Sequence, residues 1–286
     1  MKITALSEHC CHLGEGPLWD PLEAALYWVD SFGPTLYRHD YESSRTRSWT
    51  LPGDTIGSLA LRATGGLLLA MDRGLYVFNP GNGKVESVVE PLAGKDGLRL
   101  NDGKVDPFGY FVTGAMNIDF RQNVDCAMYR LSPDFELSEI LQGFSCFNGP
   151  CFSADGDRLY VTGRDESAIE VFDYGRNELP RNGRVLLGGC NPDGATVDAD
   201  GYLWSAQWDD ACIIRVSPEG SIDRRIEFAG QVVSSLTFGG PDLDLIYVTT
   251  TGAEVHGVAP TAAQPGRVLV VSGAGYRGRA EPFFAG

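Results

Sequence analysis

Six short segments along the chain open in a similar way, and five of the six opening residues are polar and carry oxygen atoms that can bind a cation. The six opening residues are Glu15, Ile56, Asn101, Asn148, Asp193 and Ser234. Carboxylate and amide oxygens are the ligands that hard divalent cations such as Ca²⁺ and Mg²⁺ prefer. If the six residues form one ring, its two carboxylates and two amides could hold such an ion.

Turn formation is the alternative explanation for these polar residues. Asn-Gly, Asn-Asp-Gly and Pro-Asp-Gly sequences favour turns, and a residue before a strand is often polar because it ends a loop. Their recurrence at one repeat position favours a shared site instead. The sequence has four histidines but no His-Glu-x-x-His motif, so a histidine-rich zinc site is disfavoured. We expect each of them to be structural or solvent-facing: they are His9, His12, His39 and His256.

The opening residues recur at intervals of 41, 45, 47, 45 and 41 residues, which indicates an internal repeat that fills the chain. A turn and a short run of aromatic and β-branched residues follow each opening, and most repeats add a third such run. Thirty-six glycines and 16 prolines, without an apolar stripe of period 3.6, leave little room for helices. About four strands in each ~44-residue repeat predict an all-β fold, a single six-bladed β-propeller domain over residues 1–286.

A propeller would bring the six opening residues into one ring, because the first strand of each blade lines the central channel. The near-constant repeat length favours this fold over a β-sandwich, whose strands would alternate without a fixed period. The segment Ile3-Thr-Ala-Leu6 lies before the first repeat. We expect residues 3–12 to add a strand to the last blade, since that pairing removes an open edge between the first and last blades.

Charge and composition exclude several classes of partner. The 38 acidic and 23 basic residues give a net charge of −15, which repels nucleic acid and anionic membrane surfaces. No apolar run is long enough to span a bilayer, and Glu8 and His9 interrupt the N-terminus before a signal-peptide core can develop. Seven cysteines without a Cys-x-x-Cys pair favour reduced, buried thiols, so we expect a cytoplasmic protein, monomeric or a small homo-oligomer.

Four motifs, in their order and spacing, resemble the gluconolactonase/regucalcin family of sugar lactone hydrolases, also called the senescence-marker-protein family. The motifs are Leu13-Gly-Glu-Gly-Pro-Leu-Trp-Asp20, Arg99-Leu-Asn-Asp-Gly-Lys-Val-Asp-Pro107, Asn148-Gly-Pro150, and Pro192-Asp-Gly194 with Asp198-Ala-Asp-Gly-Tyr-Leu-Trp204. Members of this family are six-bladed propellers, and the resemblance covers nearly the full chain. It implies the same architecture that the repeats predict.

The resemblance also implies one divalent cation, bound by Glu15, Asn148 and Asp193, with its identity open among Ca²⁺, Zn²⁺, Mn²⁺, Mg²⁺ and Fe²⁺. The implied activity is hydrolysis of a sugar lactone to the sugar acid. A cation would polarise the lactone carbonyl and stabilise the oxyanion that forms as water attacks. Asp193 is our candidate general base, because a carboxylate at the edge of the cation can take a proton from water and return it to the leaving ring oxygen.

Substrate binding is implied for three further residues. Arg99 matches a residue that hydrogen-bonds the sugar hydroxyls, Asn101 one that lies close to metal and substrate, and Asp119 a substrate contact that is Glu in several relatives. Two other functions stay open: a metal-dependent hydrolase of other lactones or esters, and a non-enzymatic propeller that binds protein partners. A lactone with a long acyl chain would need an apolar entrance to its binding site. The three polar side chains instead favour a small, hydroxyl-rich ligand.

Overall fold

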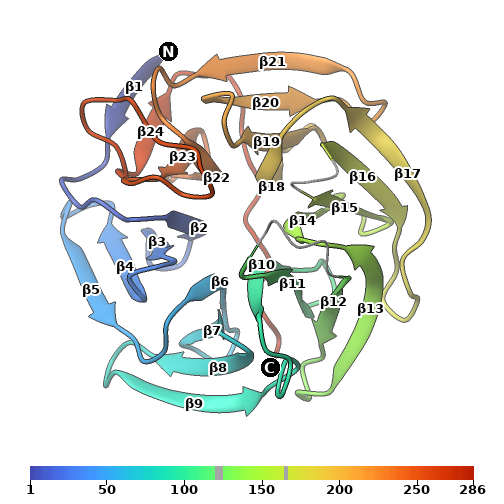
Figure 1. Cartoon of the computed structure of the whole chain (residues 1–286). Coiled ribbons are helices and arrows are strands. Elements are labelled where there is room, and N and C mark those ends of the chain that lie inside the picture. Colours follow the sequence, from blue (N-terminus) through green and yellow to red (C-terminus); the bar gives the residue numbers. More distant parts are fainter. Residues whose placement is uncertain (120–124, 164–166) are drawn as a thin grey trace.

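The computed structural model describes residues 1–119, 125–163 and 167–286, and every regular element within these ranges is a β-strand. The strands form six four-stranded antiparallel sheets, arranged as blades around a central axis (Figure 1). The six-bladed propeller that the repeats predict is therefore confirmed. The described residues contain no helix that could span a membrane.

The first three blades follow the chain from the axis outward. Blade 1 contains β2 (Gly14–Asp20), β3 (Ala25–Asp30), β4 (Thr35–Asp40) and β5 (Thr46–Thr50). Blade 2 contains β6 (Ile56–Leu61), β7 (Leu67–Met71), β8 (Gly74–Asn79) and β9 (Lys84–Val89). Blade 3 contains β10 (Leu98–Val105), β11 (Phe111–Asn117), β12 (Cys126–Leu131) and β13 (Leu137–Phe144).

The last three blades repeat this order, except that the outer strand of blade 6 comes from the N-terminus. Blade 4 contains β14 (Asn148–Phe152), β15 (Arg158–Gly163), β16 (Ala168–Asp173) and β17 (Arg181–Gly188). Blade 5 contains β18 (Pro192–Val197), β19 (Leu203–Gln207), β20 (Cys212–Val216) and β21 (Ile222–Glu227). Blade 6 contains β22 (Val233–Gly239), β23 (Leu245–Thr250), β24 (Leu269–Ser272) and β1 (Lys2–Ala5).

Burial decreases from the axis to the rim of each blade. In blade 2 every residue of β6 and β7 is buried, whereas β9 at the rim is partly to fully exposed. The strand β7 is a continuous apolar run, because both of its faces pack against neighbouring blades. Between blades 1 and 6, for example, Trp19 stacks on Tyr247 with ring centroids 5.9 Å apart. Apolar packing between blades therefore stabilises the ring.

The N-terminal strand closes the ring. β1 pairs antiparallel with β24, from Lys2 opposite Ser272 to Ala5 opposite Leu269. The expectation that the segment before the first repeat supplies a strand to the last blade is confirmed. The pairing covers the edge that β24 would otherwise expose.

A β-bulge interrupts every innermost strand near its first residues. The register shifts fall at Glu15/Leu18, Ile56/Ser58, Leu100/Gly103, Asn148/Cys151, Pro192/Ala195 and Val233/Ser235. A bulge breaks the strict alternation of side chains and re-aims them. Gly16 and Gly149 lie in two of these bulges with φ of +53°, a conformation that glycine adopts without strain. The Gly-Pro dipeptides of the motifs thus shape the backbone that aims the preceding polar residue.

The C-terminal segment crosses the channel away from the first residues of the inner strands. It bridges to blade 5 at Gly278 and to blade 2 at Phe284. Between these points the Glu281 carboxylate accepts hydrogen bonds from Lys104 Nζ at 2.7 Å and from Thr196 Oγ1 at 2.9 Å. Lys104 lies near the end of β10, so Glu281 occupies the far end of the channel. The repeat pattern does not predict this path.

Candidate functional site

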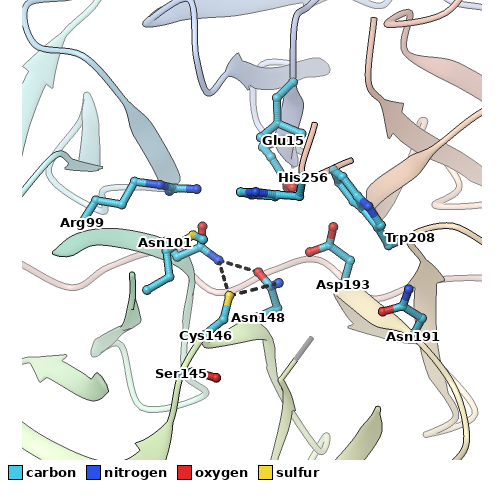
Figure 2. A pocket seen from close by; sticks show the side chains of 12 residues that line it. Glu15, Arg99, Asn101, Ser145, Cys146, Asn148, Asn191, Asp193, Trp208 and His256 are labelled. Carbon is cyan, nitrogen blue, oxygen red and sulfur yellow. Dashed lines mark hydrogen bonds between the residues drawn. The ribbon is translucent and has the colours of Figure 1, made fainter. Parts of the chain in front are cut away.

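A cavity of about 200 Å³ lies at the end of the channel where the inner strands begin. Side chains from blades 1, 3, 4, 5 and 6 converge on it (Figure 2). Its lining residues are Leu13, Glu15, Arg99, Asn101, Met116, Ser145, Cys146, Asn148, Asn191, Asp193, Trp208 and His256. The cavity therefore combines charged and polar side chains with an apolar surface.

Four of the six repeat-equivalent opening residues meet in this cavity: Glu15, Asn101, Asn148 and Asp193. The other two do not line it. Ile56 is fully buried in the apolar core between blades 1 and 2. Ser234 is also fully buried, and its hydroxyl forms hydrogen bonds with the Gly14 carbonyl and with the hydroxyl of Thr249. The ring predicted from the repeats is thus a polar cluster that lines the cavity in four blades and a structural contact in the other two.

The two asparagines of the cavity are joined by a hydrogen bond. Asn101 Nδ2 donates to Asn148 Oδ1 at 2.5 Å and to the Phe147 carbonyl at 2.9 Å. Asn148 Nδ2 donates to the sulfur of Cys146 at 3.7 Å. Both amide nitrogens therefore donate to groups at the start of β14 or just before it. The carbonyl oxygen of Asn148 keeps a second lone pair for another ligand, because an amide oxygen can accept twice.

Two carboxyl groups, Glu15 and Asp193, line the cavity, and the charge of a third, Asp102, also acts on Glu15. Burial raises the pKa of Glu15 well above its usual range, and the charges of Asp193 and Asp102 raise it further, whereas the Gly16 N–H and the charge of Arg99 lower it. The side chain of Asp193 is only 4% exposed. Like charges with so little solvent destabilise one another. The electrostatics of the site therefore favour a bound cation.

Arg99 supplies the positive charge of the cavity. Its side chain is 5% exposed, its Nη1 donates to the Leu100 carbonyl at 3.0 Å, and its guanidinium lies 5.9 Å from the ring centroid of Phe32. Burial lowers the pKa of this guanidinium, and the neighbouring Cys146 and Glu15 act against that effect. Since arginine stays protonated in proteins, it presents fixed donors to any oxygen-rich molecule in the cavity.

The donor set of the cavity fits a hard divalent cation. Among the described residues, no three His, Cys, Asp or Glu side chains cluster closely enough to hold a metal ion. A cation here would therefore need the amide oxygen of Asn148 besides the carboxylates of Glu15 and Asp193. All three donors are oxygens and two are negatively charged, which is the ligand chemistry that Ca²⁺ and Mg²⁺ prefer. The cation would also offset the repulsion between the two carboxylates.

Asp119, the third predicted substrate contact, lies outside the set of lining residues. It follows β11, is partly exposed, and its backbone N–H donates to Asn117 Oδ1 at 3.0 Å. The next residues of this loop, 120–124, lie outside the described part of the chain. The role of Asp119 in binding substrate stays a prediction.

Seven lining residues were not among the predicted site residues: Leu13, Met116, Ser145, Cys146, Asn191, Trp208 and His256. The pairing of β18 with β19 could have indicated Trp208, because the residue after the second strand of a hairpin lies beside the residue before the first, here Asn191. His256 lies in the segment between β23 and β24, where the repeats provide no guide. The expectation that every histidine is structural or solvent-facing stays a prediction for His256, which lines the cavity and is half-buried.

The fold and the cavity define a six-bladed propeller with an oxygen-rich ligand site on its axis. Residues 13–252 match the SMP-30/Gluconolactonase/LRE-like region, so the chain belongs to this family, as its motifs predict. The pentonolactonase XacC of Haloferax volcanii is 32% identical over 268 residues, covering 91% of this chain and 88% of that protein. The regucalcin of Xenopus laevis is 30% identical over 298 residues, covering 100% and 99%. The 6-deoxy-6-sulfogluconolactonase of Pseudomonas putida is 29% identical over 280 residues, covering 96% and 95%.

Solved structures share this fold over nearly the full chain. A luciferin-regenerating enzyme superposes with a TM-score of 0.93 at 25% identity, covering 99% of both chains. A regucalcin from Agrobacterium tumefaciens, described as a calcium-binding protein, superposes with a TM-score of 0.89 at 25% identity, covering 98% of this chain and 96% of that one.

Proposed function

We propose that this protein hydrolyses a small sugar lactone to the corresponding sugar acid and that the reaction depends on one divalent cation. The observation that carries the proposal is the convergence of Glu15, Asn148 and Asp193 with Arg99 and Asn101 on one cavity. Two relatives that match most of the chain, a pentonolactonase and a sulfogluconolactonase, support the substrate class.

The cation would be held by Glu15, Asn148 and Asp193, the three oxygen donors that face the cavity from blades 1, 4 and 5. When bound, it supplies an electrophile that polarises the lactone carbonyl and stabilises the developing oxyanion. Its identity remains open among Ca²⁺, Zn²⁺, Mn²⁺, Mg²⁺ and Fe²⁺.

Asp193 is proposed as the general base as well as a ligand. Its carboxylate takes a proton from water as the water oxygen bonds to the carbonyl carbon, and the bond from that carbon to the ring oxygen then breaks. The carboxylate returns the proton to the departing ring oxygen, which becomes the hydroxyl of the sugar acid. The almost complete burial of Asp193 keeps this proton transfer away from bulk solvent.

Arg99 and Asn101 are proposed to orient the substrate. Both come from β10, and the residue between them points away from the cavity, so the two polar side chains form one wall. The guanidinium donates and the amide oxygen accepts, which suits hydroxyl groups that do both. We therefore favour a polyhydroxylated lactone over an acyl lactone.

A pH-drop assay with a panel of lactones tests this function. Pentonolactones and hexonolactones are compared with an acyl homoserine lactone and with paraoxon, each with and without EDTA. We expect hydrolysis of at least one sugar lactone, abolished by EDTA and restored by added divalent metal. Full activity in a verified metal-free preparation would contradict the metal role, and hydrolysis of the acyl lactone or paraoxon alone would contradict the substrate class.

A further inference from the structure

The segment between β23 and β24 forms a tight hairpin beside the cavity. Val255 and Val258 exchange both backbone hydrogen bonds, each at 3.0 Å. The two residues between them, His256 and Gly257, have φ of +52° and +80°. Two positive φ angles are the mark of a type I′ turn, whose positions are dominated by Asn, Asp and Gly. A histidine at the first position holds a backbone conformation that is uncommon for residues with a side chain.

This hairpin is fixed to the body of the propeller by a small apolar cluster. Val255 is buried with Leu13, Trp208 and Val232, and Val258 packs against the same cluster. Two of these partners, Leu13 and Trp208, also line the cavity. The tip of the hairpin is therefore held at a defined place relative to the site.

The imidazole of His256 lines the cavity, and the residue is half-buried. Figure 2 shows the ring extending among Glu15, Arg99 and Trp208. Its ring centroid lies 6.4 Å from that of Trp208. His256 belongs to blade 6, whereas Arg99 and Asn101 belong to blade 3, which lies across the axis in a six-bladed ring (Figure 1). A ligand held by β10 on one side would therefore meet the imidazole on the other.

We propose that His256 is a specificity-determining residue, which hydrogen-bonds a hydroxyl of the sugar lactone on the side opposite Arg99 and Asn101. This inference rests on the proposed function and deepens it. An imidazole offers one donor and one acceptor in its neutral form, which matches a hydroxyl group. The substrate would then be bracketed by polar groups from two opposite blades. The enzyme would therefore have a higher kcat/KM for a lactone with hydroxyls on the two sides that face blades 3 and 6 than for a lactone without hydroxyls.

The substitution His256→Gly separates this role from a purely structural one. Glycine adopts positive φ without strain, so the variant removes the imidazole while the hairpin keeps its conformation. If His256 only formed the turn, the variant would be at least as stable as the wild type and kinetically unchanged. Ser44→Gly is the matched control, since Ser44 has φ of +53° in an exposed turn between β4 and β5, away from the cavity.

The experiment measures kcat/KM of the wild type, His256→Gly, His256→Asn and Ser44→Gly on a sugar lactone and on δ-valerolactone, which has no hydroxyl. We expect His256→Gly to lose about tenfold on the sugar lactone, the scale of one hydrogen bond, and to be unchanged on δ-valerolactone. Asn tolerates positive φ and offers both donor and acceptor, so His256→Asn should recover part of the loss. Wild-type kcat/KM in His256→Gly on the sugar lactone, or an equal loss on both substrates, would overturn the proposal.

Thermal unfolding and product binding complete the test. The melting temperature of His256→Gly should equal or exceed that of the wild type, which excludes misfolding as the cause of the loss. If the wild type hydrolyses no sugar lactone, the proposed function fails, and calorimetric titration with gluconate still decides the role of His256. Binding about tenfold weaker in His256→Gly would support the role, whereas equal binding, or no binding to either protein, would overturn it.

Discussion

The carboxamide nitrogen of Asn101 donates a hydrogen bond to the carboxamide oxygen of Asn148, 2.5 Å away, across the boundary between blades 3 and 4. The same nitrogen donates to the Phe147 carbonyl. Both bonds direct the nitrogen of Asn101 toward blade 4, so its oxygen faces the cavity (Figure 2). One side chain thus holds the amide of Asn148, a candidate cation ligand, and directs an acceptor oxygen into the cavity, where we propose that substrate binds.

Asn101→Leu should therefore weaken both metal binding and catalysis. Leucine keeps the approximate size but neither donates to Asn148 nor accepts from a ligand. We expect the metal dissociation constant to rise roughly 10- to 100-fold, as for other residues that orient a metal ligand. Calorimetric titration of the metal-free variant measures it, with the exposed Asn177→Leu as control. An unchanged metal affinity would mean that Asn148 needs no orienting partner.

Asp193→Asn separates the ligand role of Asp193 from its role as base. The amide keeps the size and one oxygen ligand but removes the negative charge and the basicity. We expect kcat to fall by at least ~10²-fold, the usual scale for loss of a general base, even at saturating metal. Steady-state kinetics over a metal titration provide the measurement. Recovery of most of the rate at high metal would transfer the base role to another group, with Asp102 and Asp119 the next candidates.

Arg99→Ala should raise KM while the metal content stays intact. The guanidinium is proposed to hold hydroxyls in the ground state and in the transition state alike, so its loss weakens binding rather than the chemical step. We expect KM to rise about tenfold or more, because hydrogen bonds to a charged donor contribute about 1.5–3 kcal/mol each. Kinetics combined with metal analysis by mass spectrometry check the result. Loss of bound metal in this variant would instead make Arg99 part of the ligand scaffold.

Glu281→Ala should destabilise the fold without altering the cavity. The substitution leaves the ammonium of Lys104 in the channel without the carboxylate 2.7 Å away. Breaking such a buried pair costs about 3 kcal/mol, and we expect the melting temperature to fall by roughly 6–10 °C. Differential scanning calorimetry measures the change against Glu42→Ala, which removes an exposed carboxylate. A melting temperature equal to that of the control would show that the ion pair contributes nothing.

The same pair makes the difference between wild type and Glu281→Ala depend on pH. Burial acts to lower the pKa of Lys104, but the charge and hydrogen bond of Glu281, together with the neighbouring Cys151 and Asp102, outweigh it, so the pKa lies above the ordinary value of 10.5. A lysine with a raised pKa in the folded state stabilises the fold fully below its unfolded pKa, and this stabilisation is lost as the pH rises through the folded pKa. The difference in melting temperature should therefore be constant from pH 7 to 9 and shrink above about pH 10.5.

Repeat spacing predicts the backbone of this molecule better than it predicts its side chains. The intervals between opening residues locate all six innermost strands, because each repeat must bury one sheet between two neighbours. Equivalent backbone positions do not make equivalent sites, however. The side chain of Ser234 is short, and its hydroxyl bonds to the neighbouring Gly14 carbonyl instead of reaching the cavity. Glu15 and Asp193 have longer or differently aimed side chains and reach it.

The positions of His256 and Glu281 could not be predicted from the repeats. Both lie in the last part of the chain, in segments with no counterpart in the other repeats. The turn residues Val-His-Gly-Val are compatible with a hairpin, but nothing local specifies that the hairpin packs on Leu13, a residue of blade 1. Such contacts depend on ring closure, which places the end of the chain beside its beginning. Only the folded ring reveals them.

The pairing of β1 with β24 has a consequence for how the chain folds. Lys2 and Ser272 lie roughly 270 residues apart in the sequence, so their pairing closes a very long loop. Blades 1 to 5 contain only local strand pairings, whereas blade 6 is complete only once β1 and β24 have met. Ring closure thus depends on a long-range strand pairing. Until that pairing forms, β24 keeps an unpaired edge that another chain can reach.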